Sequence, residues 1–211
     1  MSSLDFLSPA PTAIARSPME RQAIAAGARI EQRDGWNVAV AFEEEQRHRE
    51  TVAFADRSQI GKLELQYEHG LELGTATRRD DAWWCPTSRT RALVLCEPDR
   101  TAALRDELAD AVDLTSALGA LTIAGPLARE VFARFTAIDL RDQVTPVHGW
   151  RPGSVARTPG GILRESEHSW LMLFGAALGS YVWTVVADAA ASLGGGPVGA
   201  DALVAEVAAG A

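Results

Sequence analysis

The sequence predicts an α/β or α+β fold in which two similar modules share one core. Short apolar runs typical of strands alternate with helical patterns, the order expected for layers of sheets and helices. With 211 residues, 47% of them apolar, the chain can bury a sizeable core. A motif also recurs about sixty residues apart. Its members are Asp56, Ser58, Gly61, Leu63 and Leu65, and then Asp113, Thr115, Gly119, Leu121 and Ile123.

The chain is expected to begin with an arm and a capped helix. Residues 1–15 are rich in Ser, Pro and Ala without periodicity, which predicts a flexible or loosely docked arm. Ser17 and Pro18 favour a helix start, because serine can cap free N–H groups and proline has none to satisfy at the first helical position. Gly27 predicts the end of that helix.

A polar helix and a strand are expected next. Residues 43–52 alternate glutamate and arginine, a composition typical of a solvated helix face. Leu63 and Leu65 then alternate with polar residues, which is the period-two pattern of a half-buried strand. The polar residues of that pattern are Lys62, Glu64 and Gln66.

Three strand-turn-helix units follow. The first has an apolar run at 91–96, and Asp99 is placed to cap a helix that carries Ala103, Leu104, Leu108 and Val112. The second has residues 121–124 before Gly125-Pro126, after which Leu127, Val131 and Phe135 recur every four residues. The third has residues 170–174 before a helix that carries Leu178, Val182, Val185 and Ala189. Gly194–Gly196 lacks the surroundings of a nucleotide loop and predicts a hinge or linker.

The charge pattern argues against nucleic acid as a partner. The net charge is −8, and the 20 basic residues are scattered or interleaved with acids. The longest apolar run near an end is too short and too rich in glycine to span a bilayer, and the N-terminus lacks the order of a signal peptide. These features predict a soluble cytoplasmic protein without a membrane partner.

Cysteine and histidine give no sign of a metal site or of a nucleophile–base pair. Cys85 and Cys96 are the only cysteines, and no companion ligand stands at metal-binding spacing. Free cysteine is among the most buried residue types, so both thiols are expected to be buried.

Several spaced segments resemble the aminomethyltransferase (glycine-cleavage T-protein) folate-binding superfamily, and most of all the gamma subunit type of heterotetrameric sarcosine oxidase. These are Arg16–Glu20, Gly27-Ala28, Gly35-Trp36, Asp56–Leu65, Val112–Thr115, Ala120–Val131, Ile138–Leu140, Leu163–Glu165 and Tyr181–Trp183. The resemblance implies one T-protein-like domain over 16–211, with interlocked modules at 16–111 and 112–206. The family's C-terminal β-barrel is expected to be lacking.

Members of that family bind tetrahydrofolate in a central cleft, so the resemblance implies a cleft of this kind. This sequence departs from the family's pattern at three places. Ala76 and Thr77 stand where the family has two glycines, the tyrosine before the glutamate segment at 165–167 is missing, and Ala200 replaces an arginine. We therefore expect tetrahydrofolate binding to be weak or absent, and no group to be covalently attached to this chain.

The candidate site residues lie in two segments. Asp80 and Asp81 match the family's acidic pair and are the candidate catalytic acid or base, since a carboxylate in a closed cleft can position an amine. Two solvated acids in a surface hairpin are the alternative.

Trp83, Trp84, Glu165 and Glu167 are the candidate ligand-binding residues. Adjacent tryptophans in a strand point to opposite faces, so if one fills the core, the other is expected to be exposed or covered by a partner or a ligand. Asp56 with Ser58, and Asp113 with Thr115, are expected to shape turns through side-chain bonds to the backbone.

Two functions follow from the resemblance. The first is an accessory, gamma-like subunit of a multi-subunit flavin-dependent oxidase of the sarcosine-oxidase type, with larger flavin-containing subunits as partners. The second is a stand-alone enzyme that uses the folate-type cleft for a small molecule, by tetrahydrofolate-dependent one-carbon transfer or by acid/base chemistry at Asp80 or Asp81.

Overall fold

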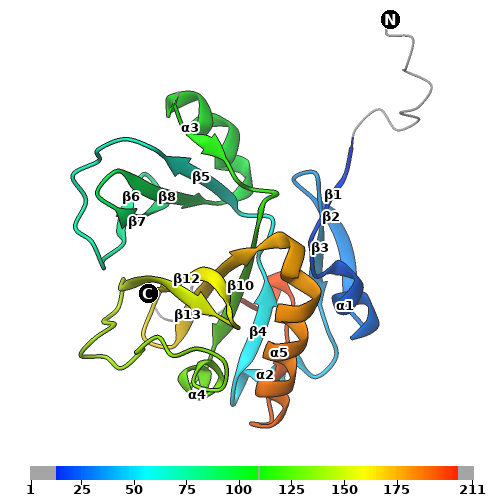
Figure 1. The fold of residues 1–211 in the computed structure, drawn as a ribbon. Helices are drawn as coiled ribbons and strands as arrows, with labels where there is room; N and C mark the ends of the chain where they lie inside the picture. The colour runs from blue at the N-terminus through cyan, green and yellow to red at the C-terminus, as the bar shows by residue number, and fades with distance from the viewer. Residues whose placement is uncertain (1–12, 109, 204–211) are drawn as a thin grey trace, which may run out of the picture.

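The computed structural model describes residues 13–108 and 110–203, so most of the predicted arm and the end of the second module lie outside the described residues. Three sheets and several short helices make up the fold (Figure 1). The N-terminal sheet contains β1 (Ala15–Arg16), β3 (Trp36–Ala41) and β2 (Arg29–Arg33), in that order.

The central and upper sheets hold the remaining strands. The six-stranded central sheet has the order β11 (Trp150–Val155), β12 (Thr158–Arg164), β13 (Ser169–Gly175), β10 (Leu118–Ala124), β4 (Ala53–Asp56) and β14 (Gly196–Pro197). The five-stranded upper sheet has the order β6 (Thr77–Arg79), β7 (Ala82–Ser88), β8 (Arg91–Cys96), β5 (Gly61–Leu65) and β9 (Val112–Asp113).

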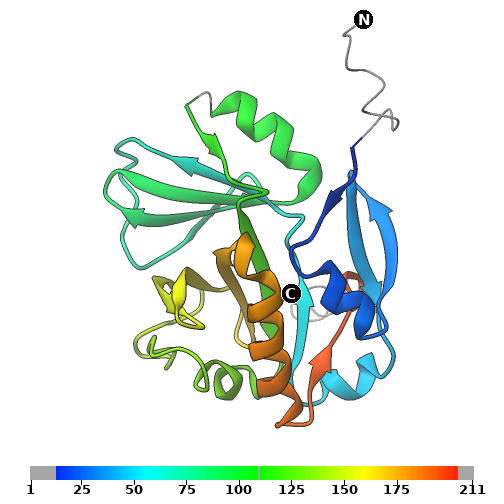
Figure 2. The ribbon, with the colours of Figure 1, turned by 45° about the vertical axis from the view of Figure 1, so that its right-hand side comes forward.

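The helices cover the outer faces of these sheets. They are α1 (Glu20–Ala25), α2 (Glu45–Arg49), α3 (Thr101–Glu107), α4 (Ala128–Phe132) and α5 (Gly179–Ala191), with short 3₁₀ turns at Pro98–Arg100 and Ala176–Leu178. Figure 2 shows the N-terminal sheet on one side of α5 and the β11–β12 hairpin on the other. The pairings of the two larger sheets are antiparallel except for β4 with β14, so the fold is α+β rather than a parallel doubly wound sheet.

Strand alternation divides the core into layers. In β13, Trp170, Met172 and Phe174 pack against α4 and α5, whereas Leu171 and Leu173 pack against the upper sheet. The upper sheet in turn buries its other face, including Leu63 and Val94, under α3. The order of layers is therefore α3, upper sheet, central sheet, and then α5 with α4 and α1.

The first helix ends as the sequence predicts, but it begins at Glu20, two residues after Pro18, and Met19 at its N-cap makes no side-chain cap bond. The Ser17 hydroxyl accepts the N–H of Met19 at 3.0 Å and donates to the Asp56 carboxylate. At the other end, Gly27 has φ +87°, its N–H bonds the Ile24 carbonyl, and Ala28 N–H bonds the Ala23 carbonyl at 2.9 Å. These bonds form a Schellman motif, which requires the left-handed conformation that glycine adopts readily.

Four local expectations are wrong. Asp99 lies inside the 3₁₀ turn and does not cap α3, and Val112 lies in β9 rather than in that helix. Lys62 is fully buried although its pattern marked it as polar. Gly194–Gly196 is a packed connection rather than a linker, because a Cβ on Gly195 would lie 2.0 Å from the Val52 carbonyl oxygen.

Candidate functional site

The centre of the molecule is the place where two chain segments cross between the larger sheets. One segment leaves β4 in the central sheet and enters β5 in the upper sheet, while the other leaves β9 in the upper sheet and enters β10 in the central sheet. Leu121 pairs with Asp56, and Leu63 pairs with Asp113. The repeated sequence motif thus corresponds to two equivalent, reciprocal crossings.

Matched hydrogen bonds hold these crossings. The Asp56 carboxylate accepts the Ser58 N–H at 2.9 Å, and the Asp113 carboxylate accepts the Thr115 N–H at 2.9 Å. Across the segments, Ser58 Oγ accepts the Ala120 N–H at 3.2 Å and Thr115 Oγ1 accepts the Lys62 N–H at 3.1 Å. The turn-shaping interpretation of both Asp-x-Ser/Thr pairs is confirmed.

Lys62 is a central residue that the sequence pattern misplaced. Its Nζ donates to the carbonyls of Ser58 and Ile60 at 2.8 Å each and to the Thr115 carbonyl at 3.1 Å. Burial lowers the pKa of Lys62 to about 8, although the nearby Asp56 carboxylate opposes that shift. This buried ammonium ties the two crossings together.

Glu165 is held by an internal arginine. Arg57, at the first crossing, donates to both Glu165 carboxylate oxygens at 2.9 and 3.0 Å and to Glu97 at 3.1 Å. Burial lowers the pKa of Arg57, but the two carboxylates together outweigh that effect and the net shift is upward. The Glu165 side chain is only 15% exposed, so its charge is neutralised inside the chain.

Asp80 and Asp81 form the two-residue turn between β6 and β7. Their φ angles are +48° and +62°, and Arg79 pairs with Ala82, so the turn has the twist favoured in tight hairpins. Both residues are exposed, and neither lines the two cavities described below. The structure places them in a surface hairpin rather than in adjacent strand positions, and their catalytic role stays a prediction.

Trp83 and Trp84 point to opposite faces of β7, as expected, but neither is bare. Trp83 packs on the cluster between the two larger sheets and lies 5.0 Å from the His148 ring, centroid to centroid. Trp84 packs on the cluster under α3. Both rings are half-buried, so neither fills the core completely, and their covering by a partner or a ligand stays a prediction.

Glu167 borders a small hollow of about 130 Å³ together with Arg129, Arg164 and His168. Arg164 already bonds the Asp142 carboxylate at 2.6 Å and the carbonyls of Thr145, Ser166 and Glu167. Glu165 and Glu167 consequently have different surroundings, and Glu167 is 80% exposed.

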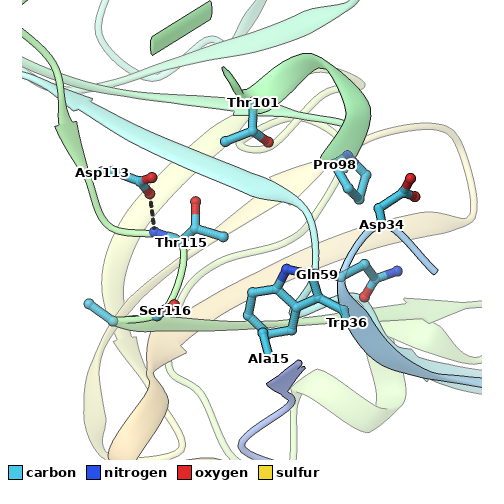
Figure 3. A pocket seen from close by; sticks show the side chains of 10 residues that line it. Ala15, Asp34, Trp36, Gln59, Pro98, Thr101, Asp113, Thr115 and Ser116 are labelled. Carbon is cyan, nitrogen blue, oxygen red and sulfur yellow. Dashed lines mark hydrogen bonds between the residues drawn. The ribbon is translucent and has the colours of Figure 1, made fainter. Parts of the chain in front are cut away.

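A larger cavity of about 550 Å³ opens between the N-terminal sheet, the second crossing and the start of α3 (Figure 3). It is lined mainly by Ala15, Asp34, Trp36, Gln59, Thr101 and Asp113. None of the candidate site residues predicted from the sequence belongs to its lining.

Comparison with known proteins was made by sequence and by structure. No protein-family model and no curated protein matches the sequence. Among solved structures, the glycine cleavage system aminomethyltransferase T from Bartonella henselae matches with a TM-score of 0.73 and 15% identity, over 90% of this chain and 61% of that chain. The chain has a T-protein-like fold.

A second match to this T-protein-like fold comes from a multi-subunit enzyme. Heterotetrameric sarcosine oxidase from Corynebacterium sp. U-96 matches with a TM-score of 0.67 and 18% identity, over 87% of this chain and 98% of the matched chain. The alignment with aminomethyltransferase T, in contrast, spans about three fifths of that protein's chain.

Both cysteines are free and buried, as expected, and burial raises the pKa of the Cys85 thiol well above 9.0. Within residues 13–108 and 110–203, no group of His, Cys, Asp and Glu side chains is arranged to hold a metal ion. No helix in this part of the chain is long and apolar enough to cross a bilayer.

Proposed function

We propose that this chain is a gamma-like accessory subunit of a multi-subunit, flavin-dependent oxidase of the sarcosine-oxidase type. The observation that supports this most is the structural match over 98% of one chain of heterotetrameric sarcosine oxidase. In this role the chain uses its T-protein-like fold to dock larger flavin-containing subunits, which supply the redox chemistry.

The state of Glu165 also supports a docking role over folate chemistry. A carboxylate that positions a ligand amine needs a free oxygen facing a cleft. Both Glu165 oxygens are instead bonded to Arg57, and Asp80 and Asp81 lie in an exposed turn. The chain thereby keeps the T-protein-like fold, while its own Arg57 side chain occupies the Glu165 carboxylate.

The proposed docking face is formed by two loops that meet at Arg151. Arg151 bonds the carbonyls of Gly74 and Val144, which belong to the loops before β6 and before β11. Leu73, Val144 and Val147 on these loops are 52%, 39% and 42% exposed. Exposed aliphatic residues on loops that are held in place suit contact with a partner subunit.

The test is co-expression of the tagged chain with flavin-containing oxidase subunits from the same genome. We expect a stable complex that carries flavin absorbance and produces hydrogen peroxide from sarcosine. The double change Leu73→Ser and Val144→Ser should weaken assembly by about tenfold or more without lowering the melting temperature of the isolated chain. Ile24→Ser, which changes a 53% exposed residue on α1, is the matched control and should assemble normally.

Two results would contradict the proposal. One is assembly with the oxidase subunits that is unaffected by the loop variant but abolished by Ile24→Ser. The other is tetrahydrofolate-dependent one-carbon transfer by the isolated chain, which would favour the stand-alone enzyme.

A further inference from the structure

The cavity beside Trp36 has the size of a small-molecule site. Its volume of about 550 Å³ lies within the roughly 300–1,000 Å³ typical of ligand pockets. Three separate stretches of chain build it: the N-terminal sheet, the crossing at Asp113–Ala117 and the turn that begins α3. Figure 3 shows Trp36 facing Thr101 across the hollow, with Asp113 and Asp34 at its two ends.

The charge of the lining has one sign. Asp34 and Asp113 are its ionisable residues, and no lysine, arginine or histidine contributes to it. Among the described residues Asp34 forms no ion pair, and Asp113 has only the 3.7 Å contact with Arg105, whose side chain is 53% exposed. Such an exposed contact neutralises little of the carboxylate charge, so the cavity attracts cations.

The backbone that carries Asp34 and the carboxylate of Asp113 are held in position before any ligand arrives. Asp34 has φ +49° in the turn that joins β2 to β3, and Arg33 pairs with Trp36 on either side of that turn. Ala15 N–H bonds the Gly35 carbonyl at 2.8 Å and fixes the turn against β1. The Asp113 carboxylate is fixed by the Thr115 N–H at 2.9 Å. Preorganised groups lose less conformational entropy on binding.

Trp36 adds a recognition element that carboxylates alone lack. Its indole is half-buried and lines the cavity between the two acids. The face of an indole attracts ammonium groups through its quadrupole, and its area also suits an apolar or planar ligand body. We propose that this cavity binds a small organic cation, with the ammonium group near Asp34 or Asp113 and the body on Trp36.

The probe for this site is benzyltrimethylammonium, with benzyl alcohol and phenylacetate as neutral and anionic counterparts. Binding is followed by the indole N–H resonance of Trp36 in ¹⁵N-labelled protein, assigned from its loss in Trp36→Phe, and by calorimetry. We expect the cation to shift that resonance and to bind about tenfold or more tightly than either counterpart.

Single substitutions test which carboxylate contributes to binding of the cation. Asp34→Asn keeps a side chain that tolerates the left-handed conformation, and Asp113→Asn keeps an oxygen that can accept the Thr115 N–H. Each should weaken binding of the cation by about fivefold or more. Trp36→Leu should weaken it similarly, with a far-UV spectrum unchanged from wild type.

The matched control is Asp80→Asn. Asp80 has nearly the same φ as Asp34 and stands in an equivalent two-residue turn, so this change alters the net charge equally at a turn outside the cavity. It should leave the affinity for the cation unchanged. Equal binding of the neutral probe, no binding of the cation, or a loss of affinity in Asp80→Asn alone would overturn the proposal.

The proposal does not depend on the accessory-subunit function, because the docking loops contribute nothing to this cavity. The same measurement on the isolated chain and on an assembled complex separates the two. If the isolated chain does not bind the cation, the proposed accessory-subunit function is unaffected. If the chain does not assemble with the oxidase subunits, the proposed cation site is unaffected.

Discussion

At the scale of single residues, Lys62 is a charged group whose burial disfavours its charged form. Its ammonium is fully buried and compensated by three backbone carbonyls rather than by a direct carboxylate contact. Its folded pKa of about 8 lies below the usual 10.5, so between these values the unfolded chain binds more protons. The contribution of Lys62 to the free energy of unfolding therefore rises as pH increases from about 8 towards 10.5.

We predict that this dependence disappears in Lys62→Met. Between pH 8 and pH 9, the free energy of unfolding of wild type should rise relative to that of the variant by up to about 1.4 kcal/mol. Burial also raises the pKa of Cys85 and Cys96, but both proteins contain these thiols and their effects cancel. Urea denaturation at several pH values measures the difference, and a constant or falling difference would show that the ammonium is not destabilised by burial.

The sequence could not identify Lys62 as buried, because alternation reports only which residues share a face of a strand. Glu64 and Lys62 share a face, yet the Glu64 side chain is 18% exposed and pairs with Arg91, whereas Lys62 lies under the second crossing. That crossing comes from a segment about fifty residues away in sequence. Burial of this kind depends on tertiary contacts that a local pattern does not contain.

At the scale of elements, the two crossings are equivalent in bonding but different in burial. Ser58 is 1% exposed, whereas Thr115 is half-buried at the edge of the large cavity. Solvent therefore lies closer to the Thr115 hydroxyl than to the Ser58 hydroxyl, although the amides that they accept belong to Lys62 and Ala120, which are both fully buried.

We predict that Ser58→Ala destabilises the chain more than Thr115→Val. The first change leaves the buried Ala120 N–H without its acceptor and should cost about 1–3 kcal/mol, and the second should cost less. Chemical denaturation of both variants checks the order. Equal costs, or a larger cost for Thr115→Val, would mean that the hydroxyl bonds at the crossings do not follow burial.

A further prediction concerns the glycines before β14. Gly195→Ala places a methyl group 2.0 Å from the Val52 carbonyl oxygen and should destabilise the chain by about 1–3 kcal/mol or more. Gly175→Ala is the matched control, because nothing lies within 4 Å of its Cβ position. Thermal unfolding should separate the two variants, and equal melting temperatures would restore the linker interpretation of Gly194–Gly196.

The bounds of an element were predicted correctly where the residue type at a turn indicates the backbone conformation. Gly27 was predicted to end the first helix, and it does so through a Schellman motif. The β6–β7 hairpin was predicted only as the alternative for Asp80-Asp81, and the β11–β12 hairpin was not predicted, because both turns, the second at Ala156-Arg157, adopt positive φ without glycine. The surrounding strands impose that conformation, so the local sequence carries little trace of it.

At the scale of the whole molecule, the T-protein-like fold was predictable from spaced motifs, while the location of the cavity beside Trp36 was not. Its lining comes from three distant segments, and Trp36, Asp113 and Thr115 are the lining residues that belonged to a motif. The sequence pointed instead to Glu165, and the Arg57 side chain that occupies Glu165 comes from the other half of the chain.

We predict that tetrahydrofolate binds weakly or not at all. By the resemblance to the T-protein family, Ala200 stands where that family has an arginine that could pair with a ligand carboxylate, and a charge-assisted bond of that kind is typically worth about 1.5–3 kcal/mol. Calorimetric titration of the isolated chain with tetrahydrofolate measures this. A dissociation constant in the micromolar range or tighter would contradict this prediction and favour a stand-alone enzyme that transfers one-carbon units.

The reciprocal crossings also determine how the polypeptide can be divided. Each larger sheet takes strands from both halves of the chain, since β4 completes the central sheet beside β10 and β9 completes the upper sheet beside β5. Cleavage of the connection after α3 would therefore yield two fragments, and neither fragment alone would contain all the strands of either larger sheet. Contacts between such remote segments also raise the contact order and slow folding. The two fragments would complete the larger sheets only together, because a cut after α3 leaves neither sheet intact in a single fragment.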